Sequence, residues 1–425
     1  MKNNQKKVAF LTLGCKVNQF EADSVAKQLE ENGFIVESEI TNDCDYVILS
    51  TCAVTNEAER KSRQMIAKIN KLAPNAKILV CGCASQNEAK NFEGKPNVTV
   101  VIGTSSKHLL PLIMEESGAF VVEPPLDWEE MSAPIKHRAR AYVKVQDGCN
   151  NFCSYCLIPY VRGRSRSRPL EPIVIECFNL AKHSKEIVLT GINISAWGLD
   201  IKKDMIDLLS SLSTINARIR ISSMEMNIVT PALIETIKKM TNFCEHFHLS
   251  MQSGCDKTLK EMNRHYTSSE FLEKVKLLRD AFPNCNITTD LIVGFPGETD
   301  EDFENTLETI KQAKFGFIHI FPYSSREGTV ASKKPMVDSE VVKQRVEKVT
   351  QLRNKLEKEF LQQQVGTIQE LLCEQEKDGY LVGHTRNFTK VYVDKSQLKP
   401  DDLVVVRIEK LFEDGVFAQV IEKVD

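Results

Sequence analysis

The N-terminal part of the chain alternates short apolar runs with longer segments of helical period. This alternation predicts a doubly wound parallel sheet over residues 1–118, because parallel strands need crossover connections, which are usually helices. The next stretch, 119–134, is polar and carries adjacent prolines at Pro124 and Pro125, which predicts a linker. The predicted strands are 8–13, 46–50, 77–81 and 98–102, and the predicted helices are 18–32, with Asn18 as N-cap, and 55–72.

The alternation of strands and helices resumes over residues 135–364. About six strand–helix units predict a (β/α) barrel or partial barrel, in which functional residues gather at the carboxyl ends of the strands. The last part, 365–425, has short alternating strands and the hairpin signals Asp378-Gly379 and Asp414-Gly415, so a small all-β barrel is predicted. The chain is therefore expected to be an α/β multidomain protein, with barrel strands at 141–145, 186–189, 218–222, 246–249, 286–293 and 317–322 and a charged helix at 338–364.

The composition is that of a globular protein, with 42% hydrophobic and 27% charged residues among 425. No apolar run approaches the ~18 residues that a membrane span needs, and no secretory signal is visible, so we expect a cytoplasmic protein without a membrane segment. Thirteen cysteines in a reducing compartment favour metal binding or catalysis over disulfides. The net charge of −3 means that any RNA binding would depend on local basic stretches.

The strongest motif is a CxxxCxxC loop that contains Cys149, Cys153 and Cys156 and follows a predicted strand. Three thiolates on one loop can hold three irons of a four-iron cluster and leave the fourth iron open to a ligand. A structural zinc site is the alternative. It would need a fourth ligand nearby, and the candidates Cys177 and His183 both fall in a helix-like segment.

A second set of cysteines lies two residues beyond three predicted strands of the N-terminal sheet: Cys15, Cys52 and Cys83. The carboxyl ends of parallel strands meet at one edge of a sheet, so these thiolates are predicted to converge and to hold a second open cluster. Cys81 is an alternative to Cys83, because a period of two places both on one face. We favour Cys83, which follows the strand in a turn.

The cysteine loop, placed after the first predicted barrel strand, resembles the radical S-adenosylmethionine (SAM) superfamily. The resemblance implies that SAM binds the open iron and is cleaved to a 5′-deoxyadenosyl radical, so Cys149, Cys153 and Cys156 would be the catalytic cluster ligands. Ordinary strand-end turns are the alternative reading of the other matching positions, and Met226 and Cys255 depart from the family pattern. The SAM contacts implied by the resemblance are Tyr155, Gly191, Asn193, Ser223, Glu225, Gln252, Arg264, Val293 and Gly294.

The second cysteine set lies in the segments LGCKVNQ (13–19), STCAVT (50–55) and GCASQ (82–86), which resemble the N-terminal domain of the methylthiotransferases. The segment 383–390 resembles their RNA-binding TRAM module. The family resemblance implies two [4Fe–4S] clusters, two SAM molecules per turnover, and an electron donor such as flavodoxin or ferredoxin. It also implies a monomer that adds a methylthio group to carbon two of a modified adenosine in the anticodon stem-loop of tRNA.

Among subtypes, LGCKVNQ is most similar to the enzymes that act on threonylcarbamoyladenosine next to the anticodon. Three alternatives stay open: an enzyme that modifies isopentenyladenosine in tRNA, one that modifies a ribosomal protein aspartate, and a non-catalytic iron–sulfur protein.

Two basic segments are candidate RNA contacts. In the first, arginines at every second position would project to one side of an extended chain and meet phosphates, with a carboxylate-paired strand as the alternative. In the second, charge and an aromatic ring share one face of a strand, which suits base stacking, although a core role for the ring is also open. The residues are Arg162, Arg164, Arg166 and Arg168, and then Arg386, Phe388 and Lys390.

Overall fold

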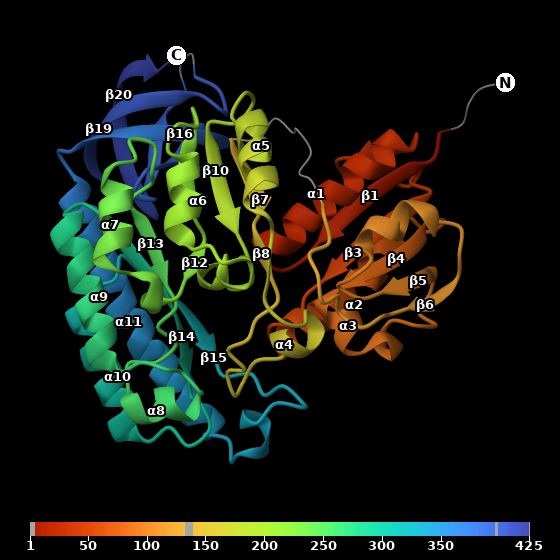
Figure 1. Cartoon of the computed structure of the whole chain (residues 1–425), viewed down its shortest axis with the longest axis horizontal. Helices are drawn as coiled ribbons and strands as arrows, with labels where there is room; N and C mark the ends of the chain where they lie inside the picture. Colours follow the sequence, from red (N-terminus) through yellow and green to blue (C-terminus); the bar gives the residue numbers. More distant parts are fainter. Residues whose placement is uncertain (1–4, 132–138, 396–397, 425) are drawn as a thin grey trace. The chain divides into compact units, whose positions relative to one another are not determined.

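The computed structural model describes residues 5–131, 139–395 and 398–424. The chain divides into two compact units: the first comprises 1–134, 146–168 and 324–332, and the second 135–145, 169–323 and 333–425 (Figure 1). The cysteine loop therefore groups with the N-terminal residues and not with the predicted barrel strands 141–145 and 186–189 on either side of it. Residues 132–138, where the predicted linker meets the predicted core domain, lie outside the described residues. The domain boundaries 1–118, 119–134, 135–364 and 365–425 stay a prediction.

The first unit contains a six-stranded, all-parallel sheet with the strand order β2-β1-β3-β4-β5-β6. The sequence correctly predicted four of these strands and missed two of only three residues each, which are too short to show a period. The strands are β1 (Lys7–Thr12), β2 (Ile35–Glu37), β3 (Tyr46–Thr51), β4 (Lys77–Gly82), β5 (Val98–Ile102) and β6 (Gly118–Phe120), and the helices are α1 (Lys16–Glu31), α2 (Asn56–Leu72) and α3 (Cys83–Asn87).

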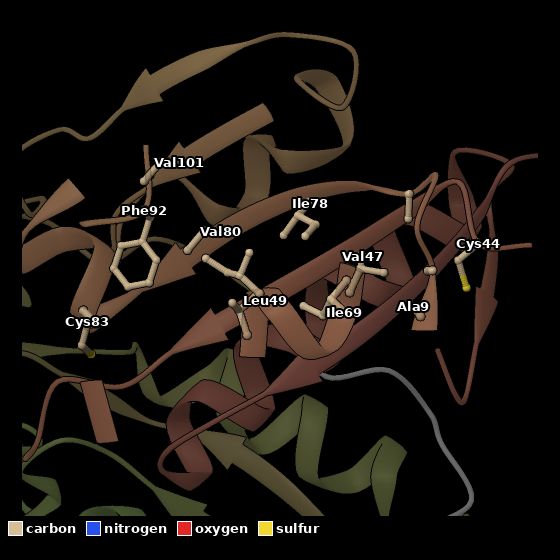
Figure 2. Packing of buried hydrophobic residues seen from close by; sticks show 14 of the residues in the cluster. Ala9, Cys44, Val47, Leu49, Ile69, Ile78, Val80, Cys83, Phe92 and Val101 are labelled. Carbon is tan, nitrogen blue, oxygen red and sulfur yellow. The ribbon is translucent and has the colours of Figure 1, made fainter. Parts of the chain in front are cut away.

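The core of this unit forms where one face of the central strands meets α2. Val47 and Leu49 of β3 pack with Ile78 and Val80 of β4 and with Ile69 of α2, and all are fully buried (Figure 2). Burying an aliphatic side chain of this size contributes about 1.5–3 kcal/mol. This apolar layer fixes the register of the strands, because a shift by one residue would turn every side chain to the other face.

The register aligns the carboxyl ends of three neighbouring strands. Thr12 pairs with Ser50, and Ser50 pairs in turn with Cys81, so β1, β3 and β4 end at the same edge. Helix α1 begins directly beyond this edge with Cys15 as its N-cap, so the predicted N-cap at Asn18 is wrong. Thr55 is the N-cap of α2, and its hydroxyl accepts a hydrogen bond from the Ala58 amide.

The second unit contains seven parallel strands in two sheets, with the orders β11-β10-β7 and β12-β13-β14-β15. A single parallel bridge between Ile219 and Phe243 continues the order from one sheet to the other. This arrangement is that of a partial barrel, as predicted. The strands are β7 (Arg140–Lys144), β10 (Glu186–Thr190), β11 (Arg218–Ile221), β12 (Ser223–Met224), β13 (His246–Leu249), β14 (Asn286–Val293) and β15 (Phe317–Pro322). The helices are α5 (Leu170–Leu180), α6 (Met205–Leu212), α7 (Pro231–Lys238), α8 (Asp256–Glu261), α9 (Ser268–Ala281), α10 (Asp300–Ala313) and α11 (Ser339–Gln364).

The C-terminal strands of the same unit close into a barrel with the order β16-β17-β18-β20-β19. Leu371, Leu381, Val391, Val404 and Val406 fill its interior and are completely buried. The predicted fold class, including the small all-β barrel, is confirmed. The strands are β16 (Ile368–Lys377), β17 (Tyr380–Thr385), β18 (Lys390–Asp394), β19 (Leu403–Phe412) and β20 (Gly415–Val424). Among the described helices, none has the length and apolar character that a bilayer crossing needs.

Candidate functional site

Cys15, Cys52 and Cys83 gather at the carboxyl edge of the first sheet. Cys52 follows the last residue of β3, and Cys83 follows the last residue of β4. The loop that carries Cys15 passes so close that a Cβ added to Gly14 would lie 3.1 Å from the Cys52 sulfur. Gly14 also has a φ of +100°, a conformation that favours glycine. This glycine therefore allows the first cysteine to approach the second.

The three thiols interact electrostatically. The pKa of Cys52 is raised to about 11, mainly by burial and in part by the neighbouring thiols of Cys83 and Cys15. Burial likewise raises the pKa of Cys83, with an added contribution from Cys15. Cys81 lies within β4, where it is the register partner of Ser50, and burial raises its pKa. Cys83 lies beyond the strand end and stays the predicted third ligand.

A buried arginine stands against this group. Arg162 is 1% exposed, and its Nε donates to the Cys83 sulfur over 3.3 Å. Its two terminal nitrogens donate to the Glu21 and Asp147 carboxylates over 2.9 and 3.1 Å, and to the Asn18 Oδ1 over 2.7 Å. A guanidinium satisfied on all sides in this way orients the sulfur that it contacts. Asn18, which was predicted to cap a helix, instead donates its amide to the backbone oxygens of Leu13 and Thr51.

Cys149, Cys153 and Cys156 lie on a loop between β8 (Gln146–Asp147) and α4 (Ile158–Val161) in the same compact unit. All three are partly exposed. The amide of Asn151 donates to the Cys149 sulfur, and that of Ile158 donates to the Cys156 sulfur, each over 3.4 Å. Backbone N–H groups directed at sulfur favour the thiolate, which is the form that binds metal.

The predicted SAM contacts of the second unit follow the carboxyl ends of neighbouring strands. Gly191 directly follows β10, Ser223 lies in β12, and Val293 ends β14. Gly294 has a φ of +76°, and a Cβ there would lie 2.4 Å from Val342, so only glycine fits. Asn193, Glu225 and Gln252 also lie in the loops after β10, β12 and β13, whereas Arg264 lies between α8 and α9.

Among these residues, Glu225 and Arg264 form an ion pair, and Arg264 also donates to the Ser250 carbonyl over 3.2 Å. The ninth predicted contact, Tyr155, lies on the cysteine loop of the first unit. The two positions that depart from the family pattern, Met226 and Cys255, are both buried. The Cys255 thiol donates to Asp302 over 3.4 Å.

The four alternating arginines do not share one exposed face, so that prediction is wrong. Arg162, Arg166 and Arg168 are all at least 95% buried. Arg166 pairs with Asp147 at 3.4 Å, and Arg168 pairs with Glu130. Arg164 is exposed and lies over the Phe152 ring, 4.5 Å from its centroid. The carboxylate-paired alternative therefore holds for the other three.

The prediction of an RNA-binding face on the C-terminal barrel is also wrong for two of the three residues, Arg386 and Phe388. Phe388 stacks between His246 and His384, with ring centroids 4.7 and 4.4 Å away. Arg386 donates to the Phe243 carbonyl over 2.7 Å. Both side chains therefore attach the barrel to the parallel sheets of the same unit. Lys390 pairs with Asp414 at 2.6 Å.

The sequence reading missed a charged cluster behind Phe388. The Glu186 carboxylate is completely buried and accepts hydrogen bonds from Arg218 and Arg220 over 2.9 and 2.7 Å. Although burial works in the opposite direction, these two guanidinium groups hold the pKa of Glu186 far below its usual range. The alternation of arginine and isoleucine along 218–221 is the signal that could have predicted a charged inner face.

Two protein families match the chain. Residues 143–310 match the Radical SAM superfamily, and residues 7–103 match a family described as "Uncharacterized protein family UPF0004". A radical SAM methyltransferase from Kitasatospora setae, TsrM, has a similar fold, with a TM-score of 0.54, 14% identity, and coverage of 77% of this chain and 74% of that chain. The partial barrel and its cysteine loop are thus those of a radical SAM enzyme, a class that uses SAM and a [4Fe–4S] cluster.

Relatives with higher sequence identity show which family of radical SAM enzymes the chain belongs to. Threonylcarbamoyladenosine tRNA methylthiotransferase MtaB of Bacillus subtilis (strain 168) is 35% identical, with 98% of this chain and 97% of that protein covered. The tRNA-2-methylthio-N(6)-dimethylallyladenosine synthase of Desulforamulus reducens is 36% identical, with 96% and 94% covered. The chain belongs to the radical SAM methylthiotransferase family, as its two cysteine trios predicted.

Replacing Arg162 tests its structural role. Arg162→Met keeps an unbranched side chain about as long as the aliphatic stem of arginine, but Glu21 and Asp147 lose a buried cationic partner. This loss should cost about 3–5 kcal/mol in the free energy of unfolding of the first unit. Urea unfolding followed by circular dichroism measures the change. The matched control Arg164→Met, at an exposed position, should change stability by less than about 0.5 kcal/mol. Equal losses in both variants would contradict the assigned network.

Proposed function

We propose that this enzyme is a tRNA methylthiotransferase that adds a methylthio group to carbon two of threonylcarbamoyladenosine next to the anticodon, using two [4Fe–4S] clusters. The observation that carries the proposal is the presence of two separate cysteine trios in one compact unit. Each trio leaves one iron of a four-iron cluster without a protein ligand, and a single such cluster would serve SAM cleavage alone. The second open cluster is what sulfur insertion requires.

The target hydrogen on an adenine ring carbon is not acidic, so general base catalysis cannot remove it at a useful rate. The cluster and SAM, when bound, supply the carbon radical that can remove it. The protein's own part is positioning. The amides of Asn151 and Ile158 stabilise the thiolates of the cysteine loop, and Arg162 orients Cys83.

The SAM contacts are part of the same proposal. Glu225 and Arg264 hold each other in place by an ion pair, which fixes polar groups near the carboxyl ends of the strands. Gly294 leaves backbone free of a side chain there. We assign to SAM binding the residues Tyr155, Gly191, Asn193, Ser223, Glu225, Gln252, Arg264, Val293 and Gly294.

The substrate assignment draws on two observations. Relatives named for tRNA modification match nearly the whole chain, and the LGCKVNQ segment favours threonylcarbamoyladenosine. The similarity to the dimethylallyladenosine synthases is equally strong, so modification of dimethylallyladenosine is the second candidate. Of the predicted RNA contacts we retain Arg164, which is exposed, and Lys390, whose side chain is partly exposed. The proposal includes a cytoplasmic monomer and an electron donor such as flavodoxin or ferredoxin.

Mass spectrometry of tRNA nucleosides tests the substrate. Cells that lack this gene should lose the methylthio form of threonylcarbamoyladenosine and regain it when the gene is restored. The methylthio form of dimethylallyladenosine should stay at its normal level, as an internal control. Loss of the dimethylallyl product alone would establish the second candidate and refute the first.

Two cysteine variants test the division of labour between the trios. Cys149→Ala should abolish both SAM cleavage and product, because the radical-generating cluster loses a ligand. Cys52→Ala should retain SAM cleavage and lose the methylthio product. Cleavage is followed as 5′-deoxyadenosine by chromatography. Cys81→Ala is the matched control and should keep both activities; normal product formation by Cys52→Ala would contradict the role of the second trio.

A further inference from the structure

Three metal-ligating side chains meet on neighbouring parallel strands of the second unit, and the proposed function uses none of them. They are His248 of β13, Asp290 of β14 and His319 of β15. One ligand atom from each lies within 4.8 Å of the others. Asp290 and His319 are direct partners in the register of β14 and β15, so the backbone pairing itself brings them together.

The three residues lie on the polar face of this sheet. His248 shares that face with Thr288, its register partner, and with Asp290 two residues further along β14. Ile287 and Leu291 point to the opposite face and are completely or almost completely buried in the apolar core. Asp290 precedes the end of β14 by three residues, so the group lies about 10 Å before the carboxyl ends, where the SAM contacts are proposed.

The hydrogen bonds of His248 direct one ring nitrogen at Asp290. Its Nδ1 lies 2.9 Å from the Thr288 hydroxyl oxygen, and its Nε2 lies 3.2 Å from the Asp290 carboxylate. The same hydroxyl lies 2.9 Å from the Nε2 of His246. One hydroxyl has one proton to donate, so at least one of these histidines must donate to it.

When His248 is the donor through Nδ1, its Nε2 turns a lone pair toward a carboxylate, unless that nitrogen also carries a proton. A cation between the two removes the repulsion. This is the usual arrangement of a metal-binding histidine, whose second ring nitrogen donates to a neighbouring oxygen and thereby fixes the tautomer. Ligand atoms about 2.1 Å from one ion lie about 3.0–3.4 Å apart in octahedral or tetrahedral geometry, and 3.2 Å agrees with this.

We infer that His248, Asp290 and His319 bind a divalent transition-metal ion. Two imidazoles and one carboxylate form the ligand set of mononuclear iron, manganese and zinc sites that keep positions open for a further ligand. An ion held here has room in its coordination shell for an oxygen donor of a bound molecule. The site is separate from both cysteine trios in ligand chemistry, since it offers nitrogen and oxygen and no sulfur.

Manganese is the probe that separates this site from the cysteines, because Mn²⁺ prefers nitrogen and oxygen ligands to thiolate. Holoenzyme with both clusters in their oxidised, EPR-silent state is dialysed anaerobically against Mn²⁺ alone, and bound Mn²⁺ is counted from the loss of the free-ion EPR signal. The parent protein should bind about one ion per chain at concentrations up to about 1 mM. Pulsed EPR of that ion should show coupling to imidazole nitrogen.

Two variants and a control decide the assignment. Asp290→Asn keeps the shape of the side chain and removes its charge, and Thr288→Val removes the hydroxyl that orients His248. We expect Asp290→Asn to lose the ion and Thr288→Val to bind it about 10–100-fold more weakly. His183→Ala, an exposed histidine outside the group, should bind as the parent does.

Circular dichroism confirms that each variant is folded before it is compared. No Mn²⁺ bound by the parent at about 1 mM would overturn the inference. Binding that Asp290→Asn leaves unchanged, or a bound ion without nitrogen coupling, would overturn it equally.

Discussion

The arrangement of the first unit depends on the hydrogen bonds of one buried guanidinium, that of Arg162. Arg162 follows the cysteine loop in sequence and reaches Cys83 at the end of β4, Glu21 on α1 and Asp147 at the start of the loop. It therefore joins both cysteine-bearing parts of the unit through one buried cation. Lys107 adds a second buried cation on Glu21, so each carboxylate in this network has a cationic partner.

A buried charge network of this kind is costly to form and costly to disrupt. The free-energy cost of desolvating each ion is offset only when all of its oppositely charged and hydrogen-bonding partners are present. Burial also affects the thiols. It raises the pKa of Cys52 to about 11, so the thiol of the metal-free protein is protonated near neutral pH. Metal binding must then displace that proton. A metal bound at Cys52 would therefore have to take it as the thiolate.

The places of Cys52 and Cys83 could be predicted from the sequence for a simple physical reason. Cys52 and Cys83 directly follow strand ends, and parallel pairing carries those ends to one edge whatever the surrounding side chains are. The sequence prediction failed for Arg162, Arg386 and Phe388. A period of two shows which residues share a face, but not what covers that face. Carboxylates cover Arg162, and the parallel sheets of the second unit cover Arg386 and Phe388.

In the second unit, too, the sequence pattern does not show which side chains meet. Glu186, Arg218 and Arg220 form a buried ion cluster. The alternation along 218–221 places the two arginines on one face, but it does not show that the Glu186 carboxylate lies between them. The group of His248, Asp290 and His319 depends on the register of three strands that are far apart in sequence. Such contacts follow from tertiary pairing and cannot be deduced from spacing alone.

The most direct measurement of the central claim is the iron content of anaerobically reconstituted protein. The parent chain should hold about eight irons, and a variant with alanine at Cys15, Cys52 and Cys83 together should hold about four, in one cluster that still binds SAM. Equal iron in the two proteins would contradict the presence of a second cluster at the edge of the first sheet.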